Sequence, residues 1–99
     1  MKNLSQTQLR HLRGLAHGLT PIVTVGAAGL TDSVIEELDA SLQHHELLKV
    51  KIRSDDRESR GAVIQDIEQR LGAVVVQRIG HTATFFRRNR KKPRITLSA

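Results

Sequence analysis

The chain has 99 residues, no cysteine, and an excess of basic over acidic side chains that gives a formal net charge of +6. This length suits one domain with a modest core. The lack of cysteine excludes disulfides, thiolate zinc sites and a cysteine nucleophile. No apolar run approaches membrane-spanning length and the N-terminus lacks a signal-peptide stretch, so we expect a cytoplasmic protein without membrane contact.

The charges are distributed unevenly along the chain. Residues 1–31 sum to +3, residues 32–86 to −3, and residues 87–99 to +6. A basic segment attracts polyanions, because each neutralised phosphate releases counterions. The alternative is a basic C-terminal segment that only aids solubility. We favour a nucleic-acid partner.

The first predicted helix begins at Ser5, which has capping-box spacing to Gln8, and ends at Gly18. Its apolar face consists of residues at helical intervals, namely Leu9, Leu12, Leu15 and Ala16. Three further side chains recur every three or four residues and form a basic face, namely Arg10, Arg13 and His17.

A short apolar run, Ile22 to Val25, predicts a buried central strand. The loop Gly26-Ala27-Ala28-Gly29 follows, and Thr31 can cap a second helix that runs to His45. Glycines at both ends of such a loop allow a sharp turn and the close approach of another backbone. The helix start adds unpaired N–H groups and a positive dipole end, which favour a phosphodiester contact. Asp32 competes for the same N–H groups, so we expect a passing contact instead of a deep phosphate cradle.

The next predicted strand alternates aliphatic and basic side chains. Leu48, Val50 and Ile52 form its buried face, and the cations on the opposite face are Lys49, Lys51 and Arg53. A third helix is predicted over 56–70, followed by strands at 73–79 and 83–87 joined by a turn. Ile95-Thr96-Leu97 predicts a short edge strand.

The predicted order α-β-α-β-α-β-β indicates an α/β fold with a single compact domain over residues 1–99. Right-handed crossovers would pack the helices on a mostly four-stranded mixed sheet. Phe85 and Phe86 are the two aromatic residues, and strand alternation predicts that one of them points inward.

Catalytic and metal-binding patterns are absent from the sequence. His11 and His17 lie six residues apart, while His44 and His45 are adjacent, so neither pair has the spacing of helical metal ligands. The serines lie in no nucleophile-elbow context, and no Walker-type loop is present. We therefore expect no enzymatic activity, no metal, no cofactor and no small-molecule substrate.

Four features together predict RNA binding: the glycine loop, the basic helix face, the basic strand face and the basic segment of about 87–99. The scarcity of aromatic residues excludes a broad base-stacking platform, so backbone contacts and shape should dominate. The candidate RNA-binding residues are Gly26, Ala27, Ala28, Gly29, Arg10, Arg13, His17, Lys49, Lys51, Arg87, Arg88, Arg90, Lys91, Lys92 and Arg94.

Several segments resemble, in the same order, those of a known family. They are Leu12 to His17, Val25 to Thr31, His45 to Ile52, Val76 to Gly80, and Phe86-Arg87. Over nearly its whole length the chain resembles the YhbY-like proteins, the stand-alone bacterial form of the CRM (chloroplast RNA splicing and ribosome maturation) domain.

This resemblance implies a fold related to the C-terminal domain of a bacterial translation initiation factor. It also implies RNA binding through the Gly-x-x-Gly loop, as in KH domains, and association with precursors of the large ribosomal subunit. Gly26, Gly29 and Arg87 match the family's pattern. The chain departs from it at Ala27-Ala28, where many members have Lys or Asn, and at Phe86, where Tyr is frequent.

The leading hypothesis is a monomeric RNA-binding accessory protein in ribosome biogenesis that binds rRNA of the large-subunit precursor. The alternative is a ribosome-associated protein-interaction module that docks through its acidic second and third helices and has non-specific RNA affinity. An enzyme acting on RNA is a third and weaker hypothesis.

Overall fold

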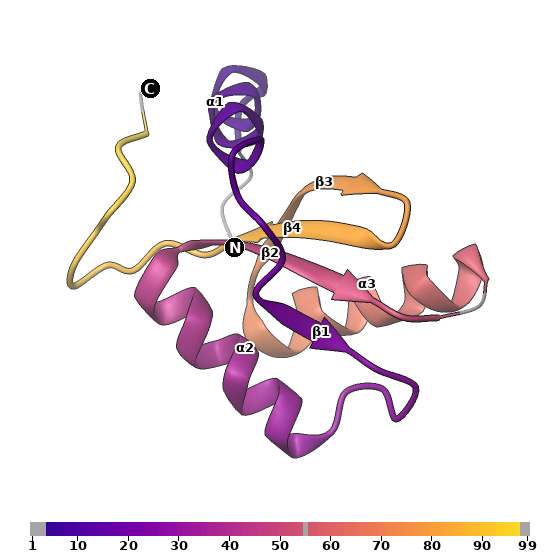
Figure 1. The fold of residues 1–99 in the computed structure, drawn as a ribbon. Coiled ribbons are helices and arrows are strands. Elements are labelled where there is room, and N and C mark those ends of the chain that lie inside the picture. The colour runs from indigo at the N-terminus through magenta and orange to yellow at the C-terminus, as the bar shows by residue number, and fades with distance from the viewer. Residues whose placement is uncertain (1–3, 55, 98–99) are drawn as a thin grey trace.

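The computed structural model of the protein describes residues 4–54 and 56–97. Its element order is α-β-α-β-α-β-β, which confirms the predicted order and the α/β class (Figure 1). The helices are α1 (Gln6–Ala16), α2 (Asp32–His45) and α3 (Arg57–Leu71). The strands are β1 (Val23–Val25), β2 (Leu47–Ile52), β3 (Val74–Ile79) and β4 (Thr82–Phe86).

The four strands form one mixed sheet in the order β1-β2-β4-β3. β1 is parallel to β2, whereas the β2–β4 and β3–β4 pairs are antiparallel. The prediction that β1 is a central strand was wrong, because it lies at the edge of the sheet. Val23 and Val25 are buried but Thr24 between them is exposed, so the apolar run of β1 is covered on one face only.

Local side-chain contacts fix where the helices begin and end. Ser5 and Gln8 form the predicted capping box, with N···O distances of 3.0 and 3.1 Å. Asp56 caps α3 through a 2.6 Å hydrogen bond from the Ser59 N–H. Gly72 ends α3 at φ 63°, a left-handed conformation that favours glycine.

The larger core lies between the sheet and the α2–α3 layer. Leu38 and Leu42 from α2 and Ile64 and Ile67 from α3 are buried against it. The sheet contributes the predicted aliphatic face of β2, together with Phe85 from β4. Burial of these apolar side chains is the main stabilising contribution to this half of the protein.

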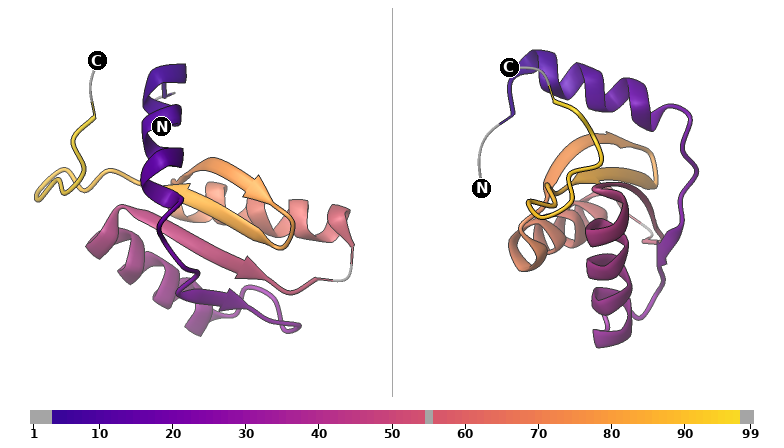
Figure 2. Two further views of the ribbon diagram at one scale, coloured as in Figure 1. Left: turned by 45° about the horizontal axis from the view of Figure 1, so that its top comes forward. Right: turned by 90° about the vertical axis from the view of Figure 1, so that its left-hand side faces the viewer.

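A second, smaller core lies on the opposite face of the sheet, under α1 (Figure 2). Leu12 and Ala16 of α1 pack there on Leu47, Val76 and Phe86. Both phenylalanines are therefore buried, and the prediction of a single inward-facing one was wrong. Strand alternation sends the two side chains to opposite faces, and each face is covered by helices at this position.

Two further predictions fail at this second core. Leu15, predicted on the apolar face of the first helix, is 42% exposed, because α1 meets the sheet mainly through Leu12 and Ala16. Residues 95–97 do not form a strand. Ile95 and Leu97 instead pack against the second core as an irregular segment.

The C-terminal segment is attached to the domain by one buried carboxylate. Glu46, at the junction of α2 and β2, has no exposed surface and a positive φ of 63°. Its Oε2 accepts a 2.7 Å hydrogen bond from the Asn89 N–H. Its Oε1 accepts from the N–H groups of Arg94 and Ile95, also at 2.7 Å, and Arg88 Nη1 lies 3.6 Å from Oε2.

Asn89 completes this attachment from the other side. Its Nδ2 donates to the Gln43 carbonyl at 2.9 Å, and its Oδ1 accepts from the N–H groups of Lys91 and Lys92 at 3.1 Å each. The basic turn after β4 is therefore held in one conformation by side-chain-to-backbone hydrogen bonds.

The surroundings of Glu46 act on its pKa in opposite directions. Burial by itself would raise the pKa. The three hydrogen bonds from backbone N–H groups, together with the positive charge of Arg88, outweigh burial and hold the pKa below its ordinary value. A carboxyl of this kind stabilises the folded state above its unfolded pKa, and the stabilisation is lost as the pH falls through the folded pKa.

We predict that Glu46→Gln lowers the free energy of unfolding by about 2–3 kcal/mol at pH 7, because the amide leaves at least one buried N–H without an acceptor. The difference between wild type and variant should narrow as the pH falls from about 4.3, the ordinary pKa of a glutamate in the unfolded chain, through the lower pKa of Glu46 in the folded protein. Urea unfolding at a series of pH values measures both effects.

The matched control is Glu37→Gln, an exposed position on α2. We expect it to change the free energy of unfolding by less than about 0.5 kcal/mol. Equal stability of the Glu46→Gln variant and wild type at pH 7, or a difference that does not change with pH, would contradict the anchoring role of Glu46.

Candidate nucleic-acid interface

The Gly-x-x-Gly loop connects β1 to α2 as a tight turn. The Gly29 N–H donates to the Gly26 carbonyl at 3.0 Å, and the Thr31 N–H donates to the Gly29 carbonyl at 3.1 Å. Ala27 and Ala28 form the exposed tip of the turn. The loop thus presents backbone and two methyl groups to the solvent, with no long side chain above them.

The two loop glycines differ in what the fold requires of them. Gly29 has φ 76°, where a side chain would be strained. Gly26 is outside that region, and a Cβ at Gly26 would have no atom within 4 Å. The fold therefore explains glycine at position 29 but not at position 26. A close approach by a partner would explain glycine at position 26.

The start of α2 is only partly available to an anion. Thr31 Oγ1 accepts the Val34 N–H at 3.2 Å, so one of the free N–H groups of the first turn is already paired. Asp32 follows in the first turn and is exposed. Fewer free N–H groups are therefore left at this helix start for an anion.

The loop shares one end of the sheet with two other turns. The Arg53 N–H donates to the Val25 carbonyl at 2.9 Å, and the Ile52 N–H to the His81 carbonyl at 2.7 Å. Arg60 Nη1 lies 3.3 Å from the His81 ring nitrogen. Arg53 was predicted as a cation of the strand face, but neither Arg53 nor Arg60 was among the candidate RNA-binding residues, because only the fold brings residues 53, 60 and 81 together.

Lys49 and Lys51 lie on the face of β2 opposite its buried aliphatic side chains, as the alternation predicted, and the fold places this face on the α1 side of the sheet. Lys51 is exposed and lies between Thr24 of β1 and Thr82 of β4. Lys49 is half-buried, and its Nζ donates to the Leu19 carbonyl at 3.1 Å. α1 covers this face only near Leu47, so the part around Lys51 is open.

The basic face of α1 has two side chains in solvent and one that reaches the sheet. Arg10 and His17 are exposed. Arg13 reaches back to the sheet, where its Nε donates to the Val76 carbonyl of β3 at 3.0 Å. This hydrogen bond uses one of the five guanidinium N–H groups, so Arg13 keeps donors for a phosphate.

The acidic side chains that the structure describes are confined to one layer of the molecule. The described acids all lie in α2, in α3 or at the residues that cap them, namely Asp32, Glu36, Glu37, Asp39, Glu46, Asp56, Glu58, Asp66 and Glu68. Asp55 lies outside the described residues. Within the described residues, α1, the four strands and the C-terminal segment carry no acid. A phosphate backbone on the α1 side would therefore meet cations without carboxylates between them.

Two arginines of the predicted site make contacts within the fold. Arg87 Nη1 forms a 2.7 Å ion pair with Asp39 of α2 and also donates to the Leu71 carbonyl at 3.0 Å. Arg88 donates to the Ile95 carbonyl at 2.7 Å and lies over the Phe86 ring at 5.9 Å. These contacts hold β4 and the C-terminal segment in place.

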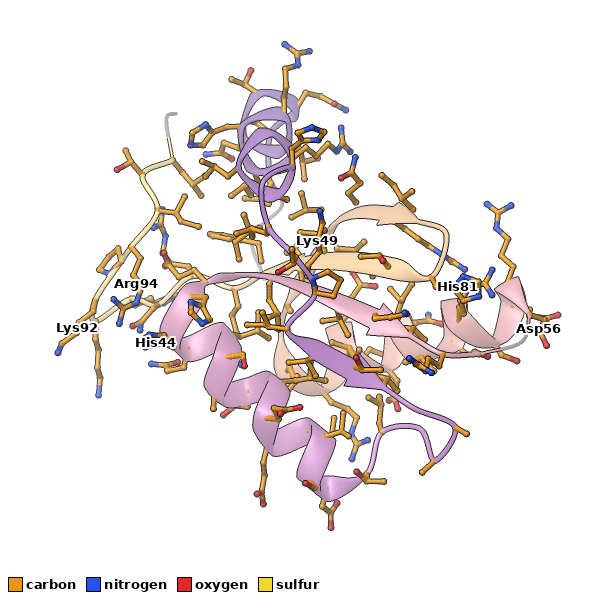
Figure 3. All side chains as sticks on the ribbon, viewed as in Figure 1. His44, Lys49, Asp56, His81, Lys92 and Arg94 are labelled. Carbon is orange, nitrogen blue, oxygen red and sulfur yellow. The ribbon has the colours of Figure 1, made fainter. Side chains whose placement is uncertain are left out.

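The remaining basic residues of this segment are exposed, namely Arg90, Lys91, Lys92 and Arg94. Figure 3 shows Lys92 and Arg94 on the side of the molecule opposite His81. Since His81 shares the end of the sheet with the glycine loop, the loop and the basic turn lie at opposite ends. The predicted site residues therefore do not all come together: the loop and the exposed basic turn are far apart, and Arg87 is paired with Asp39 of α2.

Within residues 4–54 and 56–97, no three His, Asp or Glu side chains come together in a way that could hold a metal ion. No helix in the same ranges is long and apolar enough to cross a membrane.

Comparisons with known proteins agree on one family. The model of the CRS1/YhbY (CRM) domain matches residues 4–87. An RNA-binding protein of Haemophilus influenzae is 44% identical over 87 residues, covering 88% of each chain. A probable RNA-binding protein of Bacillus subtilis, YqeI, is 32% identical and covers 95% of this chain and 98% of its own.

A solved structure shows the same fold. The solution structure of a hypothetical protein from Staphylococcus aureus superimposes with a TM-score of 0.82 at 27% identity, covering 97% of this chain and all of the other. The sequence match and the structural match both extend over almost the entire domain. The chain therefore belongs to the CRS1/YhbY (CRM) domain family.

Proposed function

We propose that this protein is an RNA-binding accessory factor of ribosome biogenesis that binds rRNA of the large-subunit precursor as a monomer. The observation that carries the RNA assignment is the restriction of the described acids to the α2–α3 layer, which leaves a cationic surface on the α1 side. Relatives named as RNA-binding proteins support it. The ribosomal assignment rests on the family resemblance.

In this proposal the RNA backbone crosses the open part of the sheet. Lys51 and the basic face of α1 neutralise phosphates at the centre, and the exposed basic turn after β4 does so at one end. At the other end the Gly26–Gly29 loop allows the backbone to come close to the start of α2. No side chain of the loop contributes charge, so the surrounding cations supply most of the affinity.

The acidic layer supports a second, compatible role. Glu36 and Glu37 are exposed on α2, on the side of the molecule away from the cationic surface. A basic ribosomal protein would be attracted to this layer by charge complementarity. RNA crosslinks should dominate over protein crosslinks in cells if RNA binding is the main function.

We predict a strong dependence of RNA affinity on salt. If about five phosphates are neutralised, the logarithm of the association constant should fall with the logarithm of salt concentration at a slope of roughly −3 to −4 for single-stranded RNA. Filter binding over a range of potassium chloride concentrations measures the slope. A flat response would exclude the cationic surface as the source of affinity.

We predict that Gly26→Asp weakens RNA binding about tenfold or more without unfolding the protein. The added carboxylate would face the phosphates, whereas its Cβ would meet no neighbouring atom. The control is Ala40→Asp, which adds the same charge at an exposed position of α2. If both variants bind RNA like wild type, the loop is not part of the interface.

The ribosomal assignment is tested in cells. We expect crosslinking followed by sequencing of the bound RNA to recover large-subunit rRNA and its precursors above all other transcripts. Recovery of mainly messenger or transfer RNA would reject the ribosomal role and leave RNA binding itself intact.

A further inference from the structure

A hollow of about 250 Å³ opens between the α1–β1 linker and the first half of β2. The linker lines it with Gly18, Leu19, Thr20 and Ile22, and it also touches Lys49 of β2 and His45 at the end of α2. We call this hollow the linker pocket. It exists because β1 is only three residues long, so the linker and not a paired strand runs beside the start of β2.

The walls of the linker pocket are apolar and uncovered. Leu19 is 40% exposed and Ile22 is 54% exposed, although the fold has two cores. Among the described residues, they are two of the four large apolar side chains left exposed, with Leu15 and Ile79. An apolar hollow with a few polar groups at its rim is the usual form of a binding site for a small ring system.

The polar groups of the linker pocket carry positive or neutral character. The Lys49 ammonium gives one hydrogen bond to the Leu19 carbonyl, at 3.1 Å, and has two further N–H groups. Thr20 and His45 are both exposed and supply a hydroxyl and a ring nitrogen. None of the residues that line the pocket is acidic.

The linker pocket lies close to the proposed path of the RNA. Ile22 is followed directly by β1 and then by Gly26, so the pocket and the glycine loop are separated by the length of a three-residue strand, about 10 Å. On its other side, His45 precedes Glu46, which holds the C-terminal segment. An RNA backbone that reaches from the basic turn to the loop would pass this pocket.

We propose that the linker pocket binds one unpaired base of the RNA. This inference rests on the proposed RNA-binding function and adds that the RNA is single-stranded where it crosses the pocket. Leu19 and Ile22 would contact the face of the base, which in a duplex is covered by stacking neighbours. Lys49 would bind the adjoining phosphate, and Thr20 and His45 would face the edge of the base.

The test fills the pocket with a side chain. Gly18 lines it, has no positive φ, and a Cβ at this position would have no atom within 4 Å. We expect Gly18→Leu to remain folded and to lower the affinity for a single-stranded RNA oligonucleotide about five- to tenfold. Its affinity for a perfectly paired RNA duplex of equal length should not change.

The control is Ala62→Leu, which adds the same side chain at an exposed position of α3 and should leave both affinities unchanged. Circular dichroism and urea unfolding would verify that both variants fold. A second measurement places 2-aminopurine in the single strand: its fluorescence should change on binding to wild type and change much less on binding to Gly18→Leu.

Two results would overturn the proposal. If the folded Gly18→Leu variant binds the single strand as tightly as wild type does, the pocket does not bind an RNA base. The pocket would then be a site for an aliphatic side chain of a protein partner. If Gly18→Leu lost the same affinity for the single strand and for the duplex, the substitution would affect the whole RNA-binding surface and not the binding of one base. If the wild-type protein bound neither the single strand nor the duplex, the proposed RNA-binding function itself would be rejected. This outcome is distinguishable from rejection of the base-binding pocket alone.

Discussion

The arrangement of the segment that follows β4 depends on the buried carboxylate of Glu46. Its two oxygens accept three backbone N–H groups from residues 89–95, a segment without a helix or strand of its own. These hydrogen bonds turn the chain after β4 and bring Ile95 and Leu97 back to the second core. The same bonds keep the carboxylate charged, since together with Arg88 they outweigh the effect of burial on its pKa. One acidic residue thereby fixes the position of the most basic segment of the chain.

The second constraint is that the sheet is covered on both faces, but unequally. α2 and α3 cover one face along its length, whereas α1 and the C-terminal segment cover only one end of the other face. The uncovered part is where Lys51 and the threonines beside it lie. Because the described acids lie in the α2–α3 layer, the uncovered part is cationic and borders the glycine loop. The proposed RNA path follows from this unequal covering and not from any single motif.

Much of the local structure could be predicted because its causes are local. The Ser5–Gln8 capping box, the Gly72 helix end and the alternation of β2 depend on residues within a few positions of one another, and the structure confirms all three. The failures at β1, Leu15 and the phenylalanines have a common cause. Each of these predictions depends on which parts of the fold cover an element. The sequence pattern of an apolar element is the same whether one or both of its faces are covered.

The order of the elements and the excess of positive charge could be predicted from the sequence, because they follow from periodicity and residue types, and the resemblance of several segments indicated the family. Which cations share a surface depends on the tertiary structure. In the tertiary structure the glycine loop and the basic turn lie at opposite ends of the sheet, and Arg87 forms an ion pair with Asp39. The fold also opens a pocket beside Lys49. These features depend on contacts between residues that are distant in the chain, and no local pattern carries that information.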